Sequence, residues 1–318
     1  MNYRRYIAML FALLCIAVYA QKKIVFYNVE NLFDTRHDSL YQDTEYTPDG
    51  DKHWTYQKYR TKIDHIAQVI ANIGEWQTPM LVGLCEVEND YCLQSLTKFS
   101  GLKNYGYQYL HHDSPDVRGI DCALLYDPLQ FELLTHQFIA VPLSDRPTRE
   151  FLYAQGAMID RTHRHTQKDT LHIYVCHMPS RLNGKASEHR RQTALKVLQT
   201  HIDSVLSAQP NAHIIVMGDF NQEPGDNLPP LQNLMLPFYQ AGKGTYKYKG
   251  IWNCLDQCYI TANTAERVKA HIFDADWLFE EDTKYLGEQP WRTYKGWRYS
   301  GGYSDHLPIW IEFLPLAE

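Results

Sequence analysis

An aspartate and an asparagine follow directly on a buried-looking strand in the C-terminal half of the chain. The apolar run 213–217 leads into Gly218, Asp219 and Asn221, and turn residues come after them. Turn formation is one interpretation, because Asp, Asn and Gly often end strands. The other is chemical, since a carboxylate at the end of a buried strand loses water and needs a metal ion, a cation or hydrogen-bond donors in return. The pair alone does not decide between the two.

Polar side chains recur beside four more apolar runs. Asn28, Glu86 and His177 each follow such a run, and Asp305 and His306 precede the last one. Because the ends of neighbouring strands meet on one edge of a sheet, we expect these side chains to converge. The repetition favours a chemical site over a set of turns.

The residue types indicate the chemistry. Several carboxylates on one edge would repel one another unless a divalent cation lay among them. Oxygen ligands of this kind suit Mg²⁺, Mn²⁺ or Ca²⁺ rather than zinc. A metal ion, a carboxylate that orients or deprotonates water, and a histidine that protonates a leaving oxygen are the components of phosphodiester hydrolysis. Asp121 and Asp256 start or lie within strands and could orient the two imidazoles.

The elements that must position these residues are many short strands and a few long helices. Apolar residues at helical spacing predict helices over 56–73 and 186–206 and a shorter one over 89–99. This mixture is typical of an α/β sandwich, and no repeat or low-complexity linker divides it. The predicted strands cover 23–27, 80–85, 107–111, 122–126, 131–136, 152–159, 171–176, 213–217, 255–261 and 307–313.

The first 20 residues have the features of a cleaved signal peptide. Arg4 and Arg5 precede a short apolar stretch, and Ala20 is a small residue at a plausible cleavage site. The stretch is too short to span a bilayer comfortably, although a signal anchor is the main alternative. We therefore expect an exported protein, periplasmic or secreted, with no stable membrane insertion after cleavage. Residues 21–318 are expected to form one domain, which we expect to be a monomer.

The charge balance restricts the partners. The chain has 31 basic and 37 acidic residues, and loss of residues 1–20 would remove two of the former and none of the latter. An acidic surface does not favour tight non-specific binding to duplex nucleic acid. It leaves open a site that neutralises its own carboxylates with metal. The seven cysteines show no zinc-binding spacing and predict no particular disulfide.

Five short motifs, in this order, resemble those of the endonuclease/exonuclease/phosphatase superfamily. This superfamily includes pancreatic-type DNases, AP endonucleases, inositol-phosphate 5-phosphatases and neutral sphingomyelinases. One motif alone is a weak signal, but five together are specific, and the resemblance runs from residue 24 to the end of the chain. The chain looks most like exported bacterial members. The motifs are Tyr27-Asn28-Val29-Glu30-Asn31-Leu32-Phe33-Asp34, Gly83-Leu84-Cys85-Glu86-Val87-Glu88-Asn89, His177-Met178-Pro179-Ser180-Arg181, Gly218-Asp219-Phe220-Asn221 and Ser304-Asp305-His306-Leu307-Pro308.

The resemblance implies a four-layer α/β/β/α sandwich with two central mixed, mostly antiparallel sheets and the site on one rim. It implies that Glu86 is the principal metal ligand and that Asn28 and Asp305 lie close to the ion. The ion would be Mg²⁺, or alternatively Mn²⁺ or Ca²⁺. Asp219 and Asn221 would hold the attacking water and a phosphate oxygen.

The resemblance also implies roles around the scissile phosphate. His177 and His306 would flank it. Asp256 would orient the second of these histidines and Asp121 the first, as in the DNase branch. Arg149 would contact phosphate.

Two further residues complete the predicted phosphate-binding set. Ser180 lies where some relatives carry Asn. Arg118 could contact phosphate or could pair with Asp116 or Asp121. The position of His177 is a tyrosine in the AP endonuclease branch, so this chain leans toward DNase-like or phosphatase-like relatives.

The expected function is metal-dependent hydrolysis of phosphodiesters, by an endonuclease or exonuclease acting on nucleic acid. The alternative substrate class is a lipid head group or an inositol phosphate. Export and an acidic net charge fit such an enzyme as well as they fit a nuclease. A catalytically inactive binding module on the same fold is the third interpretation. The intact set of Glu86, Asp219, Asn221, Asp305 and His306 argues against it.

Overall fold

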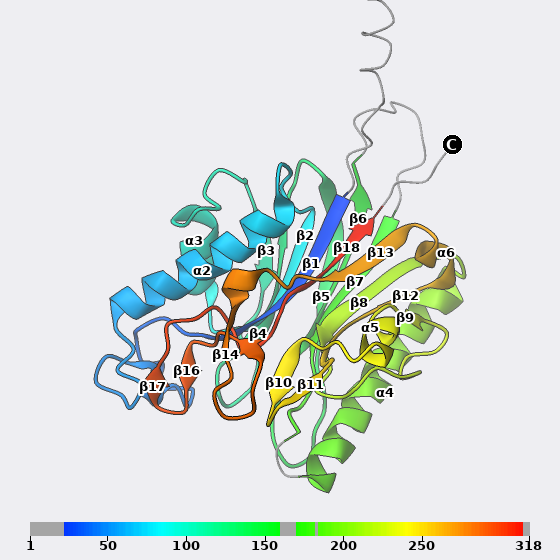
Figure 1. The fold of residues 1–318 in the computed structure, drawn as a ribbon. Helices are drawn as coiled ribbons and strands as arrows, with labels where there is room; N and C mark the ends of the chain where they lie inside the picture. The colour runs from blue at the N-terminus through cyan, green and yellow to red at the C-terminus, as the bar shows by residue number, and fades with distance from the viewer. Residues whose placement is uncertain (1–21, 160–169, 182–183, 314–318) are drawn as a thin grey trace, which may run out of the picture.

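Two six-stranded sheets form the centre of the molecule (Figure 1). The computed structural model describes residues 22–159, 170–181 and 184–313. The predicted signal peptide therefore lies outside the described residues. Within the described part, no helix is both long and apolar enough to cross a membrane.

Both sheets are mixed and mostly antiparallel, as the resemblance implied. The only parallel neighbours in either sheet are β1 with β2 and β7 with β8, among the described strands. The first sheet has the order β13 (Val268–Ile272), β18 (Ile309–Phe313), β1 (Lys22–Leu32), β2 (Leu81–Val87), β4 (Asp121–Tyr126) and β3 (Gln108–His111). The second has the order β5 (Phe131–Ile139), β6 (Phe151–Met158), β7 (Thr170–His177), β8 (His213–Asp219), β12 (Asp256–Ile260) and β9 (Gln232–Asn233).

Three apolar layers hold the sheets and helices together. Successive residues of β1 alternate between two of them, because side chains of a strand point to opposite faces. Phe26 packs between the sheets with Met217, whereas Tyr27 packs beneath α2. Leu198 of α4 packs on the outer face of the second sheet. The helices on the first sheet are α2 (Tyr56–Gly74) and α3 (Asp90–Lys98), and α4 (Lys185–Ala208) covers the second.

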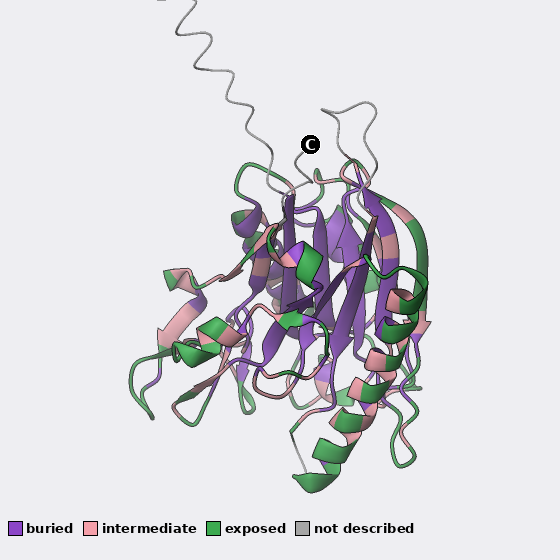
Figure 2. Cartoon of the chain, turned by 90° about the vertical axis from the view of Figure 1, so that its right-hand side faces the viewer, coloured by how far each residue is buried: buried purple, intermediate pink, exposed green. Residues whose placement is uncertain are grey.

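The result is the predicted four-layer α/β/β/α sandwich. Figure 2 shows the strands buried along most of their length, with α4 exposing its outer side to solvent. The predicted helices agree with α2, α3 and α4 to within two residues at each end. Asn89 caps α3, since its side chain accepts a hydrogen bond from the backbone N–H of Cys92 at 3.0 Å.

The first two strands extend beyond their predicted ends. β1 was expected to end at Tyr27, but it continues to Leu32, which pairs with Val87 after a register shift. Glu30 and Glu86 lie at these shifts with positive φ of 53° and 67°. Such a conformation is costly for a residue with a side chain and is common at functional sites. The bulges therefore place polar residues inside strands rather than after them.

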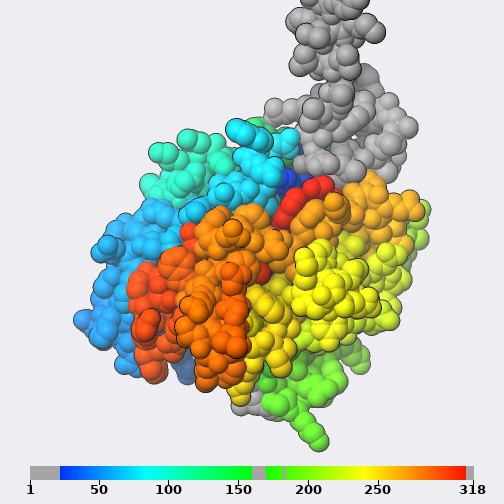
Figure 3. All heavy atoms as spheres, in the orientation of Figure 1, coloured from blue at the N-terminus to red at the C-terminus, as the bar shows by residue number. Residues whose placement is uncertain are grey.

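Short hairpins from the C-terminal half complete the fold. In Figure 3 the orange and red hairpins lie between the blue part of the described chain and the yellow segment that holds residues 246–253. Sequence patterns did not predict them, nor β13, because their strands are too short or too exposed for alternation. The six described cysteines are all free. The remaining elements are η1 (Thr44–Tyr46), α5 (Leu236–Gln240), β10 (Tyr246–Tyr248), β11 (Ile251–Asn253), α6 (Ala262–Ala265), η2 (Asp276–Leu278), β14 (Phe279–Glu281), β15 (Glu288–Pro290), β16 (Tyr294–Lys295) and β17 (Arg298–Tyr299).

Candidate active site

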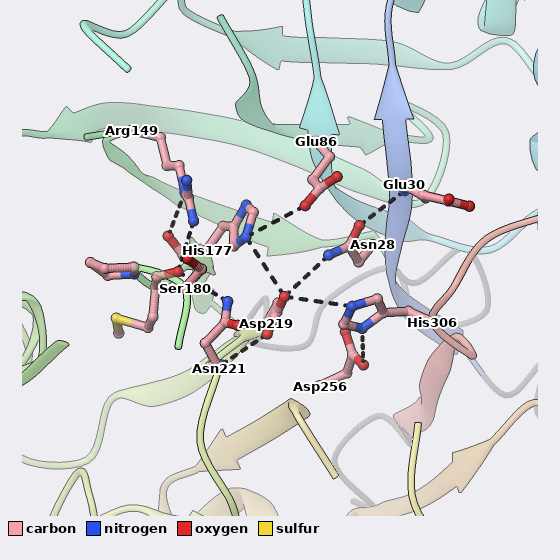
Figure 4. A network of polar contacts seen from close by, with 12 residues as sticks. Asn28, Glu30, Glu86, Arg149, His177, Ser180, Asp219, Asn221, Asp256 and His306 are labelled. Carbon is pink, nitrogen blue, oxygen red and sulfur yellow. Dashed lines mark hydrogen bonds and ion pairs between the residues drawn. The ribbon is translucent and has the colours of Figure 1, made fainter. Parts of the chain in front are cut away.

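The parallel strand pairs of the two sheets bring their carboxyl ends to one rim. His177 ends β7 and lies in register with Asp219, which ends β8. Asp219 is also in register with Asp256, the first residue of β12. Asn28 of β1 reaches across from the first sheet, and its Nδ2 donates to Oδ2 of Asp219 at 3.1 Å. Asp219 is thus the centre of a network that joins both sheets (Figure 4).

His306 is held by a buried carboxylate. Its Nδ1 lies 2.7 Å from Oδ2 of Asp256, a side chain with no exposed surface. Its Nε2 faces Asp219, 3.8 Å away. Burial alone would lower the pKa of His306, but the negative charges of Asp256, Asp219 and Asp305 hold it well above its usual range. The imidazole is therefore held as a cation with one N–H directed toward Asp219.

His177 occupies the opposite electrostatic environment. Its Nε2 lies 3.6 Å from Asp219 and 3.8 Å from Glu86. Its buried Nδ1 has no hydrogen-bond partner among the described residues. Burial, and then the positive charges of Arg149 and Arg118, hold the pKa of His177 well below its usual range. Two histidines beside one carboxylate thus favour opposite protonation states.

Asn221 is positioned by the turn after β8. Its backbone N–H donates to Oδ1 of Asp219 at 2.8 Å, and its Nδ2 donates to the carbonyl of Met178 at 3.1 Å. Its φ of 50° lies in the left-handed region that asparagine tolerates better than most residues. The turn interpretation of this segment and the chemical one are therefore compatible, because the turn presents the side chains at the rim.

The rim carries more carboxylates than its own cations neutralise. Burial raises the pKa of Asp219 to about 7, as do the charges of Asp256 and Glu86. Glu86 uses one oxygen to accept the backbone N–H of Asn31 at 2.8 Å, and the other faces His177. Asn28 still has an acceptor lone pair on its amide oxygen. This set of carboxylate and amide oxygens fits a hard divalent cation such as Mg²⁺ or Mn²⁺.

The sequence matches the Endonuclease/Exonuclease/phosphatase family over residues 23–314. The chain belongs to this family. Members are phosphoesterases and generally depend on a divalent metal. No curated protein matches the sequence significantly.

Solved structures share the family fold at low sequence identity. TDP2 of D. rerio, solved in complex with a single-strand DNA product, aligns with a TM-score of 0.56 and 18% identity over 93% of this chain and 100% of its own. A mannosyl-6-phosphatase of Bacteroides thetaiotaomicron aligns with 0.55 and 14% over 92% and 100%. A family protein of the same organism aligns with 0.57 and 14% over 94% and 99%. At these identities the likeness establishes the fold alone.

The third predicted metal ligand of this family member, Asp305, lies at the edge of the network. One oxygen is 3.7 Å from Arg292 and the other is 4.0 Å from Nε2 of His306. Tyr246 packs on the His306 ring, with the ring centroids 4.9 Å apart. Their segments, the aromatic and basic stretch 291–299 and the loop 242–252, could from sequence either bind substrate or pack as surface loops, and sequence patterns did not place Arg292 or Tyr246 beside His306.

A buried ion pair lies behind the rim and was also missed. Lys62 of α2 donates to Thr293 Oγ1 and to the carbonyl of Tyr303, both at 2.6 Å, and lies 3.9 Å from Glu30. Burial and the charge of Asp305 raise the pKa of Glu30 to about 7. In Figure 4 the Glu30 side chain points away from Asp219. The available signal was a lysine at a core position of the apolar face of α2.

Asp121 does not meet His177 as the family resemblance implied. Its carboxylate accepts hydrogen bonds from the backbone and side chain of Ser114, and none joins it to His177 among the described residues. It lies 3.9 Å from Nε2 of His111, and with Asp113 these residues form a group whose ligand atoms lie within 4.8 Å of one another. This group is separate from Glu86, Asn28 and Asp305. The orienting role of Asp121 remains a prediction without a supporting contact.

Arg149 holds the strand end that carries His177. Its guanidinium donates to the carbonyls of His177 and Met178 at 3.0 and 2.8 Å and to Asp116 at 3.1 Å. The side chain is buried and all three contacts are within the protein. Direct phosphate contact by Arg149 stays a prediction, while the structure gives it a positioning role. The sequence indicated Asp116 only as a possible partner of Arg118.

Arg118 and Ser180 line one cavity of about 170 Å³ beside the rim. Nε of Arg118 is 3.8 Å from Asp116, a separation too long for a hydrogen bond. Both alternatives for Arg118 thus remain open, since it lies near Asp116 and also lines a cavity that an anion could enter.

Proposed function

We propose that this chain is a divalent-metal-dependent phosphodiesterase that cleaves nucleic acid strands and acts after export. The observation that carries the proposal is the His306–Asp256 pair facing Asp219 across from His177. A proton donor, an acceptor for a water proton and a second imidazole then surround one space. General acid–base catalysis of phosphate ester hydrolysis uses such a donor and such an acceptor.

His306 is proposed as the general acid. Its Nδ1 is engaged by Asp256, so the Nε2 proton is the one that it can give to the leaving oxygen as the phosphorus–oxygen bond breaks. The carboxylate behind it fixes the ring and stabilises the cation until transfer.

Asp219 is proposed to orient the attacking water and accept its proton. A carboxylate whose pKa is raised to about 7 by burial is suited to taking up a proton near neutral pH. Asn221 is held within hydrogen-bond distance of Asp219 and would donate to a phosphate oxygen. The neutral His177 would donate a second hydrogen bond to the same phosphate.

Glu86, Asn28 and Asp305 are proposed to hold the metal ion. When bound, a divalent cation would neutralise charge on the phosphate oxygens. The crowding of carboxylates around Asp219 supports this assignment, because the charged forms repel in its absence.

Nucleic acid is proposed as the substrate over a lipid head group or an inositol phosphate. Support comes from the motif resemblance to DNases and from the fold neighbour solved with a single-strand DNA product. The mannosyl-6-phosphatase neighbour shows that the fold also serves sugar phosphate monoesters, so the test must include them. Export is proposed from residues 1–20 alone.

The test is a substrate panel with and without EDTA. Purified protein with Mg²⁺ or Mn²⁺ would be given plasmid in a nicking assay, oligonucleotides, sphingomyelin, a phosphoinositide and mannose 6-phosphate. We expect chelator-sensitive cleavage of the nucleic acids at a kcat/KM at least tenfold above the others. Preference for a lipid or sugar phosphate would reject nucleic acid as the substrate, and no hydrolysis of any, including bis-p-nitrophenyl phosphate, would favour the inactive module.

A further inference from the structure

An arginine-lined cavity opens beside the rim. It has a volume of about 170 Å³, several times the roughly 30 Å³ that one water molecule occupies. We call it the arginine pocket, and its cationic lining consists of Arg118, Arg146, Arg149 and Arg190. Its lining holds four arginines and one carboxylate, that of Asp116, on a chain with a net charge of −6.

Two of these arginines are engaged by the protein. Arg149 donates to Asp116 and to two backbone carbonyls, as described above. Arg190 donates to one oxygen of Asp145 through Nε at 3.0 Å and through a terminal nitrogen at 2.5 Å. The carboxylates of Asp116 and Asp145 offset the charges of these two arginines.

The other two have donors left over. Arg146 makes no hydrogen bond or ion pair with any residue in the described part of the chain, and it is exposed. The guanidinium of Arg118 likewise donates no hydrogen bond to a described residue, its nearest carboxylate being Asp116 at 3.8 Å. Burial and the neighbouring charges of Arg149 and Arg146 lower the pKa of Arg118. An anion between Arg118 and Arg146 would relieve this repulsion.

We propose that the arginine pocket binds a second phosphate group of the substrate, next to the one that is cleaved. The inference rests on the proposed function and makes the substrate class narrower: a phosphate ester with at least two phosphates. The shared chemistry is a phosphate near the scissile one, whether it belongs to a nucleic acid strand or to a small bisphosphate.

The pocket adjoins the catalytic residues without including them. Ser180 lines it and follows His177 by three residues. Arg149 also lines it and donates a hydrogen bond to the carbonyl of His177 (Figure 4). Asp219 and His306 do not line it. A phosphate in the pocket would therefore be held beside the scissile phosphate rather than in its place.

The test compares substrates that share a scissile bond but differ in neighbouring phosphates. Thymidylyl-thymidine would be compared with the same dinucleotide phosphorylated at both ends, and inositol 1-phosphate with inositol 1,4-bisphosphate. In one of the two comparisons we expect the extra phosphates to raise kcat/KM at least tenfold, mainly by lowering KM. That comparison shows whether the second phosphate belongs to a nucleic acid strand or to a small bisphosphate. Arg146→Ala should reduce the preference to less than threefold and leave hydrolysis of bis-p-nitrophenyl phosphate within twofold of wild type.

Lys196→Ala is the matched control, because it removes one exposed positive charge from the outer side of α4. It should keep the preference. The inference is overturned when wild type shows no preference in either arm, or when Arg146→Ala retains it. If the protein hydrolyses none of these esters, the proposed function fails, and calorimetry with pyrophosphate decides the pocket alone. Binding that weakens at least fivefold in Arg146→Ala supports the pocket, and equal or absent binding refutes it.

Discussion

The pair of Asp256 and His306 offers the sharpest single perturbation of this site. Asp256→Asn keeps the shape of the side chain and can still accept the Nδ1 hydrogen bond, which is 2.7 Å long. It removes the negative charge that stabilises the imidazolium. Oδ1 of Asp256 has no partner among the described residues, so an amide nitrogen could take that position without displacing another donor.

The expected loss follows from the charge. A hydrogen bond to a charged group contributes about 1.5–3 kcal/mol against about 0.5–1.5 kcal/mol for a neutral one. The Coulomb attraction of two charges about 4 Å apart adds up to ~4 kcal/mol at an effective dielectric constant of 20. We therefore expect the activation free energy to rise by about 2–4 kcal/mol, so that kcat falls ~30-fold to ~1000-fold.

The assay is hydrolysis of a phosphodiester with a poor leaving group, measured at saturating substrate beside bis-p-nitrophenyl phosphate. A good leaving group such as p-nitrophenolate needs little protonation, so its kcat should fall less than that of the poor leaving group. Because the substitution removes one partner of a buried ion pair, the unfolding free energy should fall by up to about 3–5 kcal/mol, and urea titration must show that the variant is folded under the assay conditions.

Asp127→Asn is the control, since Asp127 is a buried aspartate directly after β4, at the end of that strand away from Asp121. Its carboxylate accepts hydrogen bonds from the backbone of Leu129 and from the side chain of Gln130. Its substitution should leave kcat within twofold. If Asp256→Asn also kept kcat within threefold for the poor leaving group, or slowed both leaving groups equally, the general-acid role of His306 would be wrong.

Three other outcomes follow from buried polar groups. A lysine at position 149 cannot reach both carbonyls and Asp116, so Arg149→Lys should lower the unfolding free energy by about 3 kcal/mol in urea titrations and reduce kcat at least tenfold. An unchanged kcat would refute the positioning role of Arg149. Lys62→Met should cost about 3–5 kcal/mol of unfolding free energy because it leaves Glu30 unpaired, and adding Glu30→Gln should restore part of it; equal single and double variants would refute the coupling. Burial lowers the pKa of His172 below the value of 6.5 that it has in the unfolded chain, so the unfolded chain binds more protons and stability falls as the pH drops below about 6.5. His172→Gln should lose less stability than wild type between pH 7.5 and 5, measured as urea midpoints, and parallel curves for the two proteins would contradict this.

Residues at strand ends were predictable from the sequence because apolar runs mark where strands stop. Asp219, Asn221 and His177 were placed correctly at the rim for this reason. The four-layer arrangement was also predictable, since it came with the motif resemblance and was borne out by the three apolar layers.

The supporting contacts were not predictable, because their partners lie far away in sequence. Lys62 meets Thr293, and Glu30 accepts the backbone N–H of the same residue. The bulge at Glu86 depends on a positive φ, which cannot be predicted from the residue type because glutamate rarely adopts it. Asp121 was assigned by motif position alone, and the fold directs its carboxylate toward Ser114 instead.

We propose that the rim is a metal-dependent hydrolytic site centred on Asp219. The most direct test is the rate of bis-p-nitrophenyl phosphate hydrolysis by wild type and by Asp219→Asn, each with Mn²⁺ and with EDTA. We expect turnover by wild type with Mn²⁺, at least a hundredfold loss with EDTA, and at least a hundredfold loss in the folded Asp219→Asn variant. Turnover that survives both the chelator and the substitution would contradict it.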